Sequence, residues 1–333
     1  MLYCMIHDKR YDQLSQKKTQ LDAYRPLPED LLRNLDDWFR VELTYTSNAI
    51  EGNTLTRRET ALVIEKGITV GGKTVVEHLE ATNHVHALDW VKDQVSRLPV
   101  ELRHSDILKI HGLILAGIDH TNAGRYRNIP VRISGSSVVL PNPRKVPDLM
   151  DEFINWLTGS EELHPVQLAA EAHYRLVSIH PFVDGNGRTA RLLMNMILMM
   201  SGYPIAIIRK QDRLAYITAL EKAQLGGSTE DYLNLIVKSL HRSFDLYLNA
   251  VQGKDDISDP SDSLLRIGEL AKQVNQTNST IRHWTKEGLL TVLEHTHSGY
   301  HLYGADMIER IKTIQKLKAK RLSLGEIRDQ LSD

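Results

Sequence analysis

The chain has little of several features that mark particular classes of protein. Its 333 residues include one cysteine, Cys4, which excludes an internal disulfide framework and favours a reducing compartment. Residues 1–9 lack the sustained apolar core of a signal peptide, and the longest apolar run, 192–200, is interrupted by Asn195 and too short to cross a bilayer. Forty-one basic and forty-two acidic side chains leave a formal net charge of −1, so no global field attracts nucleic acid. We therefore expect a soluble, cytoplasmic protein with no membrane partner.

The distribution of apolar residues predicts two domains, the first almost wholly helical. An acidic, proline-containing stretch at 252–263 cannot bury apolar surface and is typical of a linker. Helical patterns before it are broken at 26–28, 141–147 and 226–227. The helices expected in this part cover residues 31–51, 77–91, 168–179, 189–200, 214–225 and 232–249.

The most informative segment is residues 180–191, His-Pro-Phe-Val-Asp-Gly-Asn-Gly-Arg-Thr-Ala-Arg. A buried helix is expected after its glycine-rich turn, and a helix N-terminus favours an anion, phosphate above all. Arg188 and Arg191 lie three apart, so on a helix they can bind the same polyphosphate. Asp184 is placed to hold a magnesium ion that bridges phosphate oxygens, and His180 can take a proton from a hydroxyl. The segment therefore predicts attack of a hydroxyl on a nucleotide phosphate.

The same segment resembles, without a mismatch, the Fic family signature H-P-F-x-[DE]-G-N-G-R-x-x-R. The resemblance implies an all-α enzyme that transfers AMP from ATP to a Ser, Thr or Tyr hydroxyl of an unknown target protein or of itself, with Mg²⁺ or Mn²⁺. It implies that His180 is the general base, that Phe182 anchors the loop in the core and that Asp184 binds the metal. It also implies that phosphate is bound by Gly185, Asn186, Gly187, Arg188 and Arg191. A glycine-rich helix cap with solvated charges is the alternative.

A flap is expected before this segment. Gly-Arg-Tyr-Arg at 124–127, followed by the β-branched runs 131–133 and 138–141, resembles the family's flap. The Ser-Gly-Ser-Ser sequence at 134–137 predicts that the two runs form a small β-hairpin. An exposed hairpin edge can accept a target segment as an added strand, whereas an ordinary surface hairpin is the alternative.

Two further helices match the family. Glu80, Asn83 and Ala87 recur at helical spacing within 77–91, where the family has a core helix. The predicted helix 168–179 leads into the catalytic loop, and we expect its His173 to be packed or capping rather than a second base.

A second motif, Ser-Asn-Ala-Ile-Glu-Gly-Asn, covers residues 47–53. Glu51 ends a predicted helix, where a carboxylate opposes the macrodipole unless a cation compensates it, and Ser47 lies on the same face. The motif resembles the [ST]-x-x-x-E-[GN] inhibitory motif that precedes the core in one class of Fic proteins. The resemblance implies that Glu51 pairs with Arg191 and withholds it from the γ-phosphate; a solvated helix end is the alternative. A different activity, removal of AMP from proteins with Glu51 orienting a water, also remains open.

The C-terminal part contains a third pattern. Helices are expected at 267–273 and 279–286, and a wing is expected at 299–303. A basic amphipathic helix is expected at 305–321, and the sequence Leu-Gly-Glu-Ile-Arg follows it at 324–328. The pattern I-G-E-L-A … I-R-x-W … E-G-L-L … G-Y-x-L-Y … L-G-E-I-R resembles the winged helix-turn-helix domain of the MerR family. The resemblance implies DNA binding, and with it a regulator in which the Fic domain only senses nucleotide.

Several departures weigh against DNA binding. Family members carry arginines in the wing, where this sequence has Glu294, His295 and His301. They also dimerise through a long helix after the domain, whereas this sequence stops at Asp333. Residues 264–333 contain eleven Lys and Arg against eight Asp and Glu, a net charge of +3 that is modest for a phosphate-driven binder. Arg282 is the expected DNA contact; the alternative is docking to a protein or between subunits of a homodimer.

We divide the chain accordingly. Residues 1–110 form an N-terminal helical region with the inhibitory helix, and 111–251 form the Fic catalytic core. The linker covers 252–263, and the MerR-like domain covers 264–333.

Overall fold

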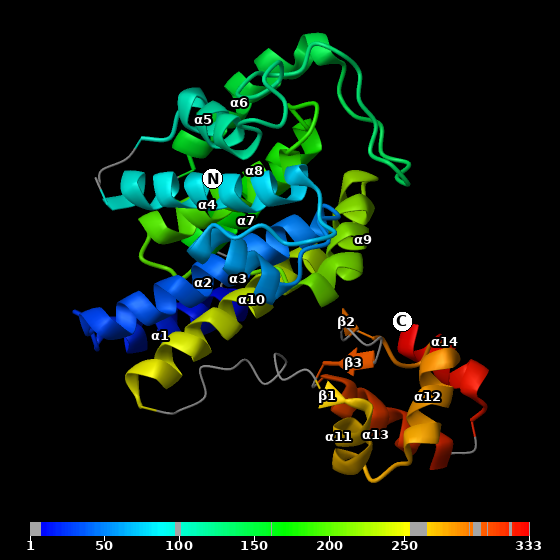
Figure 1. The fold of residues 1–333 in the computed structure, drawn as a ribbon. Coiled ribbons are helices and arrows are strands. Elements are labelled where there is room, and N and C mark those ends of the chain that lie inside the picture. The colour runs from blue at the N-terminus through cyan, green and yellow to red at the C-terminus, as the bar shows by residue number, and fades with distance from the viewer. Residues whose placement is uncertain are drawn as a thin grey trace. The chain divides into compact units, whose positions relative to one another are not determined.

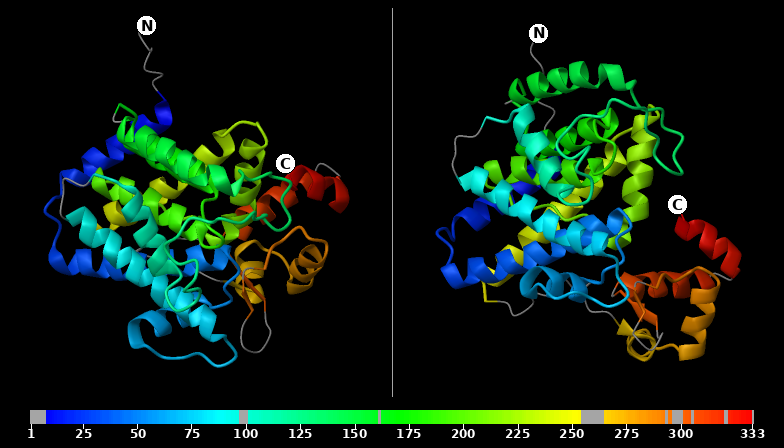
Figure 2. Two further views of the ribbon diagram at one scale, coloured as in Figure 1. Left: turned by 90° about the horizontal axis from the view of Figure 1, so that it is seen from above. Right: turned by 45° about the horizontal axis from the view of Figure 1, so that its top comes forward.

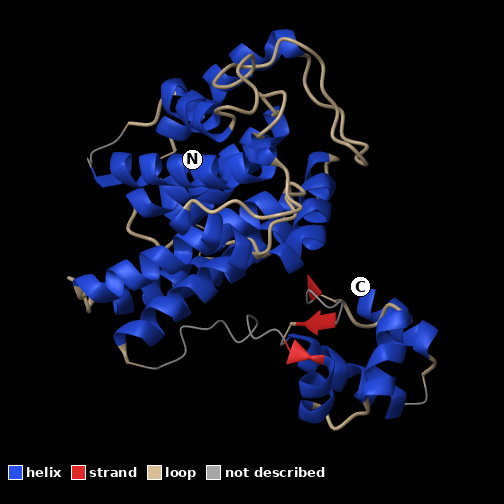
Figure 3. Cartoon of the chain, in the orientation of Figure 1, coloured by secondary structure: helices blue, strands red, loops and turns tan. Residues whose placement is uncertain are grey.

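The computed structural model describes residues 8–96, 101–160, 162–253, 265–292, 294–295, 301–304, 306–319 and 322–332. The chain forms two compact units, Met1–Gln252 and Gly253–Asp333. The first unit is helical, and the second combines helices with a small sheet (Figures 1 and 3). Cys4 and most of the predicted linker lie outside the described residues.

The helices expected in the first unit are present, with bounds that differ by a few residues. The elements are α1 (Lys9–Asp22), α2 (Glu29–Ile50), α3 (Arg57–Lys66), α4 (Val75–Ser96), α5 (His104–Ile114), α6 (Val146–Thr158), α7 (Pro165–Ile179), α8 (Asn186–Met200), α9 (Arg213–Gln224) and α10 (Glu230–Val251). Short 3-10 turns lie at Pro143–Lys145 and Lys210–Asp212. None of the described helices is long and apolar enough to cross a membrane.

Helix α8 is the central element of this unit. Its residues from Thr189 to Leu198 are buried, the polar Arg191 and Asn195 included. It packs against α7, α4, α5 and α2 (Figures 1 and 2). Because α8 is enclosed along its length, its N-terminal turn has a fixed position relative to these four helices.

The flap differs from the expected β-hairpin. Residues 128–141 are all described, and none of them belongs to a strand. The segment does turn back on itself, with the amide of Ser136 donating to the carbonyl of Ile133 at 3.2 Å. Its β-branched runs favour extended backbone, but they do not pair with each other as the predicted ladder requires.

The second unit contains β1 (Leu265–Arg266), α11 (Ile267–Gln273), α12 (Asn278–Lys286), β2 (Glu294–His295), β3 (His301–Tyr303), α13 (Asp306–Ala319) and α14 (Leu324–Ser332). The strands form an antiparallel sheet in the order β1-β3-β2. The two predicted helices are thus followed by a strand pair in the position of a wing. Trp284 on α12 is 2% exposed and belongs to the core of this unit, whereas Arg282 is exposed.

Candidate active site

His180 follows the last residue of α7 in an unusual backbone conformation. It is the C-cap residue, with φ of 51° and ψ of 59°, a left-handed conformation that is costly for a residue with a side chain. Its Nδ1 lies 3.2 Å from the carbonyl oxygen of Val177, and this acceptor places the proton on Nδ1. Burial lowers the pKa of His180, so the imidazole is neutral near pH 7 and Nε2 carries a lone pair.

The loop after His180 is anchored by Phe182 and by a histidine that sequence analysis missed. Phe182 is fully buried and stacks on the His111 ring, with centroids 3.6 Å apart. His111 accepts a hydrogen bond from the amide of Gly124 at 3.0 Å, and its Nε2 donates to the carbonyl of Asp184 at 2.9 Å. Burial lowers the pKa of His111 to about 4, which keeps this arrangement neutral. The predicted anchoring role of Phe182 therefore has a structural basis in a ring pair.

Arg127 joins the same loop to the flap. Its side chain is buried, and its Nε donates to the carbonyl of His180 at 2.7 Å. The two terminal nitrogens donate to the carbonyls of Ile129 at 3.2 Å and Pro141 at 2.8 Å, which are the two ends of the flap. Arg127 lay in the motif that marked the flap, but nothing in the sequence indicated these partners. It fixes the base of the flap beside His180.

The glycine-rich turn is closed by Asn186 and leads directly into α8. Gly185 adopts φ of 76°, and the helix begins at Asn186, three residues before the predicted start. The Asn186 side chain accepts from the amide of Phe182 at 2.9 Å and donates to its carbonyl at 3.0 Å. The side chain thus closes the loop by binding both backbone groups of Phe182. The first-turn amides of α8 have no acceptor within the helix and make this end electropositive.

Glu51 and Arg191 meet at that helix end. Arg191 is 3% exposed and donates from Nη2 to the Glu51 carboxylate at 2.7 Å. Its Nε and Nη2 also donate to the hydroxyl and carbonyl oxygens of Ser47, at 3.0 and 2.9 Å. A side chain at Gly187 would collide with the Glu51 carboxylate, so Glu51 lies directly against the first turn of α8.

The charge of Glu51 fits this position. Burial raises the pKa of its carboxyl group, but the charge and hydrogen bond of Arg191 outweigh burial and hold the pKa below its usual value. Glu51 is the C-cap residue of α2 and therefore sits at the negative end of that helix. The cation at Arg191 and the electropositive end of α8 compensate for this unfavourable position.

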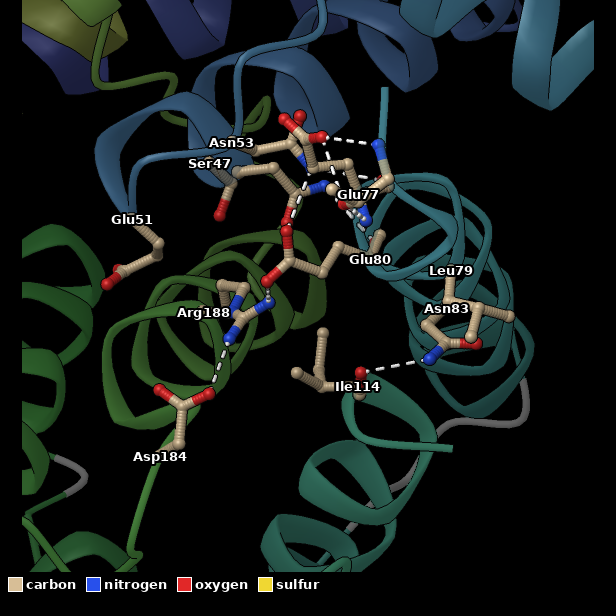
Figure 4. A network of polar contacts seen from close by, with 12 residues as sticks. Ser47, Glu51, Asn53, Glu77, Leu79, Glu80, Asn83, Ile114, Asp184 and Arg188 are labelled. Atoms are coloured by element: carbon tan, nitrogen blue, oxygen red, sulfur yellow. Dashed lines mark hydrogen bonds and ion pairs between the residues drawn. The ribbon is translucent and has the colours of Figure 1, made fainter. Parts of the chain in front are cut away.

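Arg188 has a different pair of partners (Figure 4). It donates to Glu80 on α4 at 2.7 Å and to Asp184 at 3.1 Å. Glu80 in turn accepts from the side chain of Asn53 at 2.8 Å. Sequence analysis placed Glu80 on a core helix but gave it no role. Asp184 remains the exposed member of the group, with 67% of its side chain accessible.

His173 is packed as expected. It is fully buried on α7, where Tyr216 and Tyr232 bind its two ring nitrogens at 2.8 and 2.9 Å. Burial lowers the pKa of His173 to about 3. With both nitrogens occupied, His173 has no free lone pair for proton transfer.

Comparison with known proteins agrees with this fold. The Fic/DOC family matches residues 101–198, and the MerR HTH family of regulatory proteins matches residues 265–333. A protein adenylyltransferase Fic from Nematostella vectensis is 41% identical over 206 residues, covering 61% of this chain and 48% of that protein. Another from Drosophila virilis is 38% identical over 246 residues, covering 73% of this chain and 50% of that protein. The chain thus spans about half the length of the curated relatives it matches.

Solved structures extend the comparison to the whole helical unit. A Fic domain containing signaling protein from Bacteroides thetaiotaomicron matches with a TM-score of 0.67 and 31% identity, over 74% of this chain and 99% of that one. Fic-1 from C. elegans also matches with a TM-score of 0.67 and 31% identity, over 74% of this chain and 73% of that one. The fold and the site define a Fic-type helical protein. The chain belongs to the Fic/DOC family.

Proposed function

We propose that the chain is a protein adenylyltransferase that moves AMP from ATP to a hydroxyl of a target protein or of itself. The observation that carries the proposal is a neutral His180 at the entrance to a helix N-terminus that has two buried arginines. These are a proton acceptor and an anion site, the two elements that phosphoryl transfer to a hydroxyl requires. The adenylyltransferase names of the relatives support the same reaction.

In the proposed reaction His180 is the general base. Its Nε2 takes the proton of the target hydroxyl while the hydroxyl oxygen forms a bond to the α-phosphorus of ATP. The bond from that phosphorus to the bridging oxygen breaks, and pyrophosphate leaves with the electron pair. The Arg127 hydrogen bond to the His180 carbonyl and the Nδ1 contact with Val177 hold the ring in place. Positioning and charge neutralisation provide most of the rate.

The phosphates bind, in this proposal, at the first turn of α8 through backbone N–H groups of Gly185, Asn186 and Gly187 and through Arg188 and Arg191. Asp184 fits Mg²⁺ or Mn²⁺, because its carboxylate is largely exposed and lies at the same turn. No group of three or more His, Cys, Asp or Glu residues among the described ones could hold a metal alone. One carboxylate with substrate oxygens and water is the usual arrangement for magnesium, which neutralises phosphate charge when bound.

We also propose that the chain is autoinhibited. Glu51 occupies the space beside Gly187 and neutralises Arg191, so a phosphate and the Glu51 carboxylate compete for one anion site. ATP then binds with its α-phosphate misaligned, and inhibition acts on geometry more than on affinity.

The test uses purified full-length chain with α-labelled ATP, Mg²⁺ or Mn²⁺ and cell lysate. The Glu51→Gly variant should transfer label to protein, and adding His180→Ala should abolish transfer while ATP binding stays nearly intact. Adding Asp184→Ala to Glu51→Gly should abolish the part of the label transfer that depends on the metal ion. Transfer that survives the loss of His180 would disprove the assigned chemistry.

Removal of AMP is a second candidate, favoured by one observation. Glu51 keeps 32% of its side chain accessible and lies close enough to His180 to affect the pKa of its ring. A water molecule oriented by these two residues could hydrolyse an AMP–protein bond. In this case wild-type chain should release label from an AMP-modified protein, and Glu51→Gly should not.

The second unit is a candidate nucleic-acid contact. Its similarity to MerR regulators and the exposure of Arg282 and Lys286 on α12 support this role. DNA affinity should then fall steeply with salt and drop on Arg282→Ala. No salt-sensitive DNA shift at low ionic strength would favour the protein-docking or intersubunit role.

A further inference from the structure

The flap lacks the ladder that would give a hairpin its own shape. Residues 128–141 contain no strand, and Val139 and Ile129 remain 92% and 51% exposed. Backbone pairing and core burial therefore contribute little to its position. Its conformation must depend on the points where side chains from elsewhere bind it.

One of these points lies at the two ends of the flap, where Arg127 binds the carbonyls of Ile129, Pro141 and His180. The other is the tip, where a single carboxylate oxygen of Glu221 on α9 accepts several hydrogen bonds. The Ser136 hydroxyl donates to it at 2.8 Å, the Ser137 amide at 3.0 Å and the Ser137 hydroxyl at 3.4 Å. The flap thus reaches from its base to α9 (Figure 1).

Helix α9 is a firm support for this tip contact. Its Tyr216, Ala219, Leu220 and Ala223 are buried. Tyr216 also hydrogen-bonds His173 on α7 at 2.8 Å. Helix α7 ends at Ile179, directly before His180. The tip contact is therefore connected through α9 to α7, and the Arg127 contact is made with His180 itself.

We propose that Glu221 is a positioning residue that holds the flap tip at a fixed place relative to His180. The ligand class that this arrangement fits is an extended segment of a target protein, bound along the exposed flap backbone. This target class rests on the proposed function, but the contact between Glu221 and the flap does not. The Ser137 amide and the Ser136 hydroxyl keep the pKa of Glu221 below its usual value, so it is an anion at neutral pH.

The first test is hydrogen exchange at the Ser137 amide in the full-length chain. Glu221→Ala should speed exchange roughly tenfold, the size expected for one net hydrogen bond. Glu221→Gln should have a smaller effect because it keeps an acceptor, and Ser136→Ala should also be intermediate. Lys222→Gln is the matched control, because Lys222 is the next residue on α9 and pairs with Asp231 at 2.7 Å. Equal exchange in wild type and Glu221→Ala would overturn the proposal.

The second test separates positioning from folding. In a Glu51→Gly background, Glu221→Ala should lower transfer from α-labelled ATP to lysate proteins roughly tenfold, matching the exchange effect. The dissociation constant of ATP should not change, and Glu221→Gln should restore part of the transfer. If exchange rises but transfer does not fall, flap position does not govern target acceptance. If Glu51→Gly alone transfers no label, the proposed function fails, whereas exchange at Ser137 still decides the role of Glu221.

Discussion

Arg188 and Arg191 lie one turn apart on α8, and the side chain of each is 3% exposed, yet their carboxylate partners are held in different ways. Arg191 binds Glu51, the C-cap residue of α2, whose side chain is 32% exposed. Arg188 binds Glu80, in the second turn of α4, whose side chain is 17% exposed and is itself bound by Asn53. A carboxylate at a helix end can be withdrawn, whereas one inside a packed helix cannot. We therefore expect the two ion pairs to differ in function, with the first able to open and the second part of the framework.

The largest effect is expected on the framework pair. Glu80→Ala should lower the free energy of unfolding by about 3 kcal/mol, because it leaves the buried Arg188 with only the exposed Asp184. Urea denaturation measures this change. Glu51→Gln is the control and should cost no more than about 1 kcal/mol, since its pair is partly exposed and Ser47 still binds Arg191. Equal losses in the two variants would remove the distinction between the pairs.

Opening the other pair should change activity instead of stability. Glu51→Gly should raise AMP transfer on the order of thirtyfold, corresponding to about 2 kcal/mol for one charge-assisted contact. Initial rates with α-labelled ATP measure this change. Adding Arg191→Ala should remove the gain, because the released arginine is the group that binds phosphate. A double variant as fast as Glu51→Gly would show that Arg191 has no part in the reaction.

Ser47→Ala should have a smaller effect in the same direction. It removes the hydroxyl that accepts from Arg191 but leaves the Ser47 carbonyl and Glu51 in place. We expect transfer to rise roughly fivefold, about 1 kcal/mol. The same rate assay tests it, with Ser47→Thr as the control that keeps the hydroxyl. A rate unchanged from wild type would mean that the hydroxyl does not contribute to inhibition.

The smallest effect is a pH dependence of stability. Because the pKa of Glu51 is below its usual 4.5, its stabilising contribution is present above pH 4.5 and is lost as the pH falls through the lowered value. The stability difference between wild type and Glu51→Gln, at most about 1 kcal/mol, should therefore shrink below pH 4.5. Urea denaturation at several pH values measures the difference. A difference that grows towards acid would contradict the ion pair.

The sequence predicted the parts of the site that are local in the chain. His180, Asp184 and the two arginines lie within twelve residues, so their spacing and the following apolar run locate the helix N-terminus. The contact between Glu51 and Arg191 joins residues 140 positions apart, and only the family resemblance indicated it. The helices were predicted well because their apolar periodicity is a local property.

Contacts made by a single distant side chain were not predictable in the same way. Glu80 binds Arg188 across 108 positions and His111 binds the Asp184 carbonyl across 73, and neither carries a local signal. In the flap, by contrast, a local signal was present but gave a wrong prediction, because its β-branched runs predicted strands. Instead of the predicted ladder, the structure has Arg127 bound to the carbonyls of Ile129 and Pro141, and Glu221 bound to the amide of Ser137. Asn186 likewise lies in the signature, but its side chain closes the loop.

Gly187 has a consequence for genetics. Because Gly187 has no Cβ, the Glu51 carboxylate can occupy the space beside it. A Cβ at position 187 would collide with this carboxylate and would lie 2.9 Å from Arg191. In the proposed reaction the same space receives phosphate. A substitution at 187 would thus expel the inhibitor and block the substrate together. A selection for hyperactive alleles should accordingly recover changes at Ser47 and Glu51, whereas alleles at Gly187 should be found only among inactive ones.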